Sequence, residues 1–68
     1  MGSVINMDYY RLKKFAKQGD AQSQYYLGKM YLEGKEVDQD YTAAMKWLSI
    51  AAAQGNAQAK EVLKLLKE

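Results

Sequence analysis

Two segments of this chain carry the same residue pattern 36 positions apart, and this repetition limits the possible folds more than any other feature. Asp20, which follows Gly19, is replaced after Gly55 by Asn56, and both side chains can accept hydrogen bonds at the start of a helix. A period of tens of residues indicates an array of stacked helical units. The identical pairs at this offset are Leu12/Leu48, Ala16/Ala52, Gln18/Gln54, Gly19/Gly55, Ala21/Ala57, Gln22/Gln58 and Leu27/Leu63.

Glycines and short polar residues divide the chain into four expected helices. A glycine after a helix can take the left-handed conformation that ends it, and an Asp or Asn can cap the amides of the next helix. The absence of proline and the few β-branched residues also favour an all-helical chain. We expect residues 1–6 to form a tail, in which residues 1–3 are a possible cloning remnant. Asn6 is the expected N-cap of the first helix. Residues 7–68 form one domain with helices at about 7–18, 21–33, 41–54 and 57–67.

The second expected helix has two neighbouring stripes of buried residues, so it should contact one helix before it and one after it. The stripes are Gln24, Leu27, Gly28 and Tyr31, and Ser23, Tyr26, Leu27 and Met30. Gly28 should permit the close approach of a neighbouring helix, and the ring of Trp47 on that helix is expected to lie over Gly28. The expected apolar faces elsewhere are Leu12, Phe15 and Ala16 in the first helix, and Tyr41, Ala44, Leu48, Ala51 and Ala52 in the third.

The last expected helix differs from the second at the positions 36 residues on. Lys60, Lys64 and Lys67 replace one of the two stripes, whereas the other survives as apolar residues. We therefore expect this helix to pack on one side only and to end the array with a polar face, as a terminal cap requires. The surviving apolar residues are Ala59, Val62, Leu63 and Leu66.

The segment 20–55 resembles the Sel-one-like repeat, a relative of the tetratricopeptide repeat. The residues that carry the resemblance are Ala21, Tyr25, Leu27, Gly28, Tyr31, Gly34, Val37, Asp40, Ala44, Trp47, Ala51, Ala52 and Gly55. It implies an αα-hairpin solenoid, with one complete repeat and a half-repeat on each side, that binds other proteins and is not an enzyme. The chain departs from the family at Glu36, where a glycine is usual, and at Asp38, where a proline is frequent.

The composition argues against several other functions. The chain lacks Cys and His, which excludes disulfides, thiolate nucleophiles, the usual zinc fingers and an imidazole base. A net charge of +2 gives no general reason to expect nucleic acid or an anionic membrane as a partner. The acidic loop around Asp38 lacks the spacing of a calcium site, so we expect no metal and no cofactor. Without a leader or an apolar run of about 20 residues, a cytoplasmic protein is expected, unless a leader was removed.

Two classes of function remain. The first is a protein-interaction module, such as a small bacterial adaptor, or an immunity or inhibitor protein that blocks a cognate effector. The second is self-assembly by end-to-end stacking, because Tyr9, Tyr10 and Phe15 have no earlier repeat to cover them all. By analogy with tetratricopeptide repeats, Tyr25 and Leu32 would be the main anchors of an inner face that binds a peptide or partner protein. The inner-face candidates are Gln22, Tyr25, Lys29, Leu32, Glu33, Gln58, Glu61 and Leu65.

Overall fold

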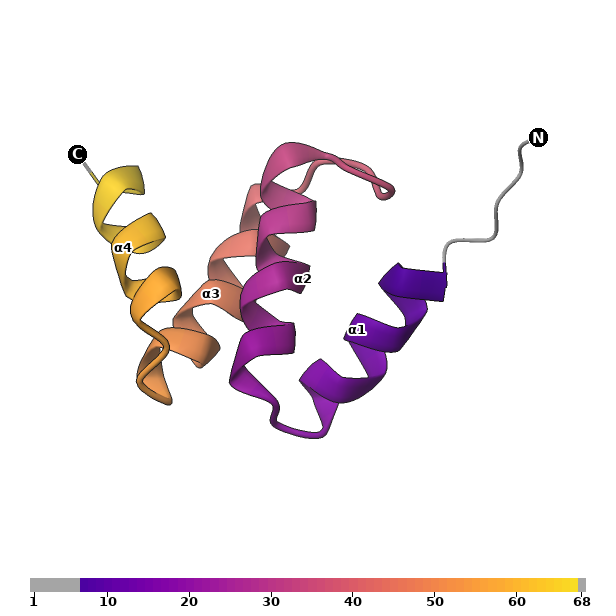
Figure 1. The fold of residues 1–68 in the computed structure, drawn as a ribbon. Helices are drawn as coiled ribbons and strands as arrows, with labels where there is room; N and C mark the ends of the chain where they lie inside the picture. The colour runs from indigo at the N-terminus through magenta and orange to yellow at the C-terminus, as the bar shows by residue number, and fades with distance from the viewer. Residues whose placement is uncertain (1–6, 68) are drawn as a thin grey trace.

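Four helices follow one another in the computed structural model, which describes residues 7–67, with side chains from Tyr9 onward (Figure 1). The described residues contain no strand, so the predicted all-α fold is confirmed. The expected Asn6 cap and the tail lie outside the described residues. The helices are α1 (Met7–Lys17), α2 (Ala21–Glu33), α3 (Tyr41–Ala53) and α4 (Ala57–Leu66).

Each helix packs against the next one along the chain, and α2 therefore has neighbours on both sides. Figure 1 shows α1 splayed from one side of α2, with α3 and α4 on the other. The expected position of α2 between two neighbours is confirmed. The row of helices gives an elongated molecule of 39 × 25 × 16 Å.

The turn between α1 and α2 has the same geometry as the turn between α3 and α4. Gly19 and Gly55 both have positive φ angles, +102° and +95°. The amide of Asp20 donates to the Phe15 carbonyl at 3.0 Å, and that of Asn56 donates to the Ala51 carbonyl at 3.0 Å. These bonds close a Schellman motif at each helix end. The 36-residue repetition of the sequence is thus also a repetition of backbone structure.

Short polar side chains cap the three helices that follow turns, as predicted from the sequence. Each accepts a hydrogen bond from the backbone amide three residues later, which satisfies one of the otherwise unpaired amides of the first turn. The pairs are Asp20 with Ser23 at 3.0 Å, Asp40 with Ala43 at 3.0 Å and Asn56 with Ala59 at 2.8 Å.

The contact between α2 and α3 is centred on Gly28 and Leu48. A Cβ atom on Gly28 would lie 2.8 Å from Cγ of Leu48 and 3.3 Å from the carbonyl oxygen of Ala44. Leu48 and Leu27 are the largest fully buried side chains. The predicted close approach at Gly28 is correct, but the residue that it admits is Leu48 rather than Trp47. Trp47 is only partly buried, with Lys46 Nζ 5.7 Å from its ring centroid.

A buried glutamine connects α2 to the helices on both sides. Gln24 is 2% exposed, and its Nε2 donates to the carbonyl oxygen of Ala16 in α1 at 3.0 Å. Its Oε1 accepts from Nε2 of Gln54, just after α3, at 2.7 Å. Because a buried amide without partners would destabilise the fold, these bonds explain how a polar residue occupies this stripe.

Four residues expected on apolar faces are largely exposed, which corrects the sequence prediction. Tyr41 begins α3 and Leu66 lies in the last turn of α4, so each is at the end of its helix. Phe15 in α1 is 42% exposed and Tyr26 in α2 is 45% exposed, because no further helix of the described chain covers this side.

The loop between α2 and α3 explains why a glycine suits the position of Glu36. Glu36 has a φ angle of +69°, in the left-handed region that glycine adopts at lower cost. The loop is held by hydrogen bonds from the Asp40 amide to the Tyr31 carbonyl at 2.9 Å and from Gln39 Nε2 to the Leu32 carbonyl at 2.8 Å. Val37, an apolar residue in this charged loop, is partly buried.

The hydroxyl groups of Tyr9 in α1 and Tyr31 in α2 lie 3.0 Å apart and share a hydrogen bond. This bond, followed by burial and by the charges of ionised Tyr9 and of Asp40, raises the pKa of Tyr31 to about 12 from the ordinary 10.0. The folded chain therefore holds this proton at pH values where the unfolded chain releases it.

We expect stability to fall as the pH rises from about 10 to about 12. The contribution of Tyr31 is fully present below the unfolded pKa and disappears as the pH passes through the folded pKa. Tyr31→Phe should therefore lose less stability over this interval than the natural chain, as measured by the urea midpoint. Tyr26→Phe is the matched control on the same helix. Equal slopes for Tyr31→Phe and the natural chain would contradict the assignment.

Candidate functional site

The predicted inner face is made of residues from α2 and α4, and the structure joins the two helices at their N-terminal ends. Nε2 of Gln22 donates to Oε1 of Gln58 at 3.1 Å. Oε1 of Gln22 accepts from Nδ2 of Asn56 at 3.0 Å. Gln22 and Gln58 are equivalent residues of the repeat, and both are exposed. The structure thus brings these two predicted site residues together as a pair of amides at the surface.

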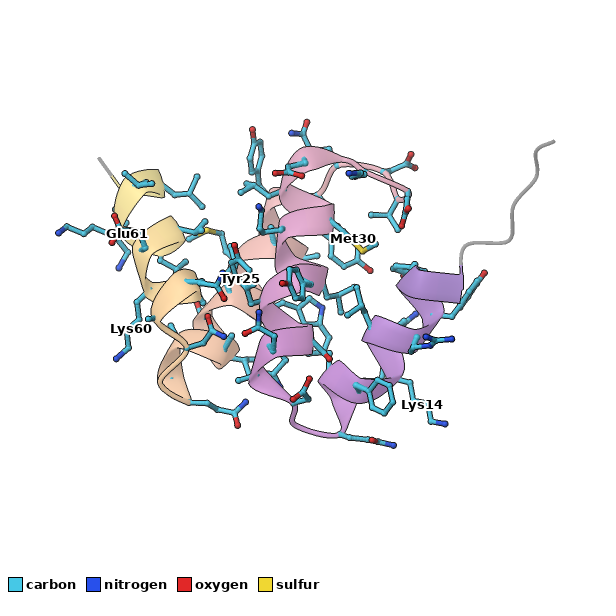
Figure 2. All side chains as sticks on the ribbon, viewed as in Figure 1. Lys14, Tyr25, Met30, Lys60 and Glu61 are labelled. Carbon is cyan, nitrogen blue, oxygen red and sulfur yellow. The ribbon has the colours of Figure 1, made fainter. Side chains whose placement is uncertain are left out.

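Tyr25 is a core residue, which corrects the expectation that it is an exposed anchor. It is 7% exposed and belongs to a buried cluster with Leu48, Ala51 and Ala59. In Figure 2, Tyr25 lies between α2 and α4. Tyr25 is buried because α4, the equivalent of α2 one repeat later, packs over it. The analogy with tetratricopeptide repeats had placed this position on an open face. The ammonium group of Lys29, 5.8 Å from the ring centroid, contacts the same ring.

The other predicted site residues are at least partly accessible, but they do not form one continuous cluster. Lys29 and Glu33 form an ion pair at 3.8 Å, with side chains 39% and 51% exposed. Leu32 is partly buried, whereas Leu65 on α4 is 60% exposed. In Figure 2, Glu61 lies on the side of α4 away from α2. Glu61 is the repeat equivalent of Tyr25, so it faces the position that a following helix would occupy.

A second surface, which we call the α1–α2 groove, lies between α1 and α2 and includes Lys29 and Glu33 of the predicted inner face. A hollow of about 390 Å³ separates α1 from the C-terminal half of α2. In Figure 2, Met30 lies on the side of α2 that faces α1. The apolar residues of this lining, Leu12, Tyr26 and Met30, were predicted from the sequence to face the core. The lining residues are Arg11, Leu12, Tyr26, Lys29, Met30, Glu33, Lys35 and Glu36.

Among the described residues, no group of three or more Asp, Glu, His or Cys side chains is placed to hold a metal ion. Of the helices described, none has the length and apolar character needed to cross a membrane. The groups that both surfaces present are amides, an ion pair, cations and apolar side chains, which are the groups that proteins use to bind one another.

Comparison with protein families matches residues 21–56 to the Sel1 repeat, from the start of α2 to the cap of α4. The match covers more than half of the chain. The chain belongs to the Sel1 repeat family. Sel1 repeats are non-catalytic αα-hairpin repeats that generally mediate protein–protein interaction. The predicted resemblance is confirmed. The Sel1 repeat consists of the α2–α3 hairpin, and α1 and α4 flank it on either side. No curated protein and no solved structure gave a match.

Proposed function

We propose that this Sel1 repeat protein is a non-catalytic adaptor that binds a protein or peptide through the accessible part of the inner face. The observation that carries the proposal is the exposed leucine on α4: Leu65 is 60% exposed. A leucine side chain with this exposure gains free energy when a partner covers it, at roughly 25 cal/mol per Å² of apolar surface.

The other accessible groups of the inner face suit a peptide backbone or polar side chains. The amide of Gln22 bonds to the side chains of Gln58 and Asn56 at the surface, so a partner can replace these bonds by its own. The Lys29–Glu33 pair offers one charge of each sign. Leu32 adds apolar area on α2, whereas Tyr25 supports the face from below. Glu61 extends the surface beyond α4.

Site-specific photo-cross-linking tests this face directly. A photo-reactive amino acid at Leu65 should capture a discrete protein from the native host, whereas the same group at exposed Thr42 on α3 should not. With the purified partner, Leu65→Glu should weaken binding about tenfold, equivalent to about 1.4 kcal/mol, through loss of apolar contact. Thr42→Glu introduces the same charge elsewhere and should leave the affinity unchanged. Equal capture at both positions, or equal affinities of both variants, would rule out the inner face.

A further inference from the structure

The repeat gives a direct comparison for the α1–α2 groove, because α3 and α4 are its equivalents 36 residues later. In the α3–α4 pair, Tyr25 of the preceding helix α2 enters the space between the two helices. There it packs in one cluster with Leu48, Ala51 and Ala59, against partly buried Ala52, Val62 and Leu63. The space between α3 and α4 is therefore filled by a large side chain from the first helix of the repeat.

The α1–α2 groove is lined by the equivalents of two of these residues, Leu12 for Leu48 and Tyr26 for Val62, but no described helix fills it. Leu48 and Ala51 are 0% exposed. Of their equivalents, Leu12 is partly buried and Phe15 is 42% exposed. The equivalent of Val62 is Tyr26, which is also substantially exposed. The hollow of about 390 Å³ is lined by Leu12 and Tyr26, the equivalents of two residues that pack in or against the cluster of Tyr25. The groove is thus an open position for one more α-helix.

Cations border the α1 side of this groove. Arg11 and Lys14 are exposed and line a further hollow of about 310 Å³ with Tyr10 and Phe15. Among the described side chains, neither cation forms an ion pair, in contrast to Lys29, which pairs with Glu33. An incoming helix with carboxylates along this border would therefore be attracted over the distance of a Debye length, about 10 Å at moderate salt.

These charges disfavour a second copy of this chain as the occupant. The helix that end-to-end stacking would bring to α1 is α4, because α4 is the equivalent of α2. It would place Lys64 where α2 places Gly28 against α3, with Lys60 and Lys67 at the positions of Gln24 and Tyr31 on the same stripe. These exposed lysines would then meet Arg11 and Lys14, and like charges in an interface oppose association.

We propose that the α1–α2 groove binds an amphipathic helix of a partner protein, with a large apolar side chain in the hollow and acidic residues facing Arg11 and Lys14. The bound helix would pair with α1 as α2 pairs with α3, and would complete a second repeat. This site shares Lys29 and Glu33 with the proposed inner face, but it does not include Gln22, Gln58 or Leu65.

Two labelled model peptides test the proposal. Both are stabilised helices with one apolar stripe containing a tyrosine; one carries glutamates along the flank and the other carries lysines. Fluorescence anisotropy should show the glutamate peptide binding at least about tenfold more tightly at low salt, with the difference reduced at high salt. The double variant Arg11→Glu/Lys14→Glu should reverse the preference. Lys60→Glu/Lys64→Glu on α4 makes the same change in net charge and should not.

Further variants distinguish binding in this groove from binding elsewhere on the chain. Tyr26→Asp should abolish binding of the glutamate peptide, while Leu65→Glu on the inner face should leave it unchanged; thermal melts by circular dichroism confirm that each variant is folded. Equal binding of the two peptides, absence of binding by both, or the same reversal by the α4 variant would overturn the proposal. Sedimentation should show a monomer at all concentrations. Dimers that Lys60→Glu/Lys64→Glu strengthens would identify a second copy as the occupant and would also overturn it.

Discussion

Leu48→Ala should remove a large part of the free energy of unfolding of this protein. Leu48 is fully buried between α2 and the α3–α4 cluster, and its truncation leaves a cavity that costs about 2–5 kcal/mol. At about 0.05–0.15 kcal/mol per residue, a chain of 68 residues has only about 3–10 kcal/mol in total. Urea unfolding followed by circular dichroism at 222 nm would measure the loss.

Leu65→Ala is the matched control, because it removes the same atoms from a helical leucine that is largely exposed. We expect a change within about 0.5 kcal/mol, as for most surface substitutions. If both variants lost the same amount of stability, the contact that Leu48 makes with α2 would not be central to the fold.

Gly28→Ala should have opposite effects in two backgrounds. In the natural chain the new methyl group would lie 2.8 Å from Cγ of Leu48, so side chain or helix must move. Overpacking costs about 1–3 kcal/mol, which outweighs the gain of about 1 kcal/mol in helix propensity. In a Leu48→Ala background the clash with Leu48 is absent and the methyl group partly fills the cavity, while only the tight contact of 3.3 Å with the Ala44 carbonyl oxygen remains. There the same substitution should stabilise the protein.

A double-mutant cycle in urea measures this reversal. The four proteins are the natural chain, the two single variants and the double variant, and we expect a coupling energy of about 1–3 kcal/mol. Ser49→Ala, at an exposed position of α3, controls for helix propensity and should have the same small effect in both Leu48 backgrounds. A Gly28→Ala effect of equal size and sign in the two backgrounds would show that α2 and α3 are not in contact at this point.

The helices and their ends could be predicted because their causes are local. Gly19 and Gly55 supply the left-handed residue after a helix, and Asp20 and Asn56 supply the cap of the next, within a few positions of each other. Leu27 and Leu48 could also be assigned to the core, since each lies in the middle of an apolar stripe. The close approach at Gly28 followed from the low helix propensity of glycine.

Burial at the edges of the helices could not be predicted, because it depends on which other helix lies across each edge. Tyr25 and Tyr26 are neighbours in one helix, yet the first is covered by α4 and the second borders the open groove. Helical periodicity places them 100° apart but does not say which side has a neighbour. Phe15 was misassigned for the same reason: its equivalent Ala51 is covered by α2, and no described helix covers Phe15 itself.

The matching hydrogen bonds after Gly19 and after Gly55 have a consequence for engineering. Because the chain leaves α3 with the same backbone geometry with which it leaves α1, residues 20–55 form a cassette whose two junctions are interchangeable. A tandem duplication of this cassette would need no redesigned linker, and each added unit would contact only its immediate neighbours. The length of the protein is therefore an adjustable property, set by the number of cassettes that a gene encodes.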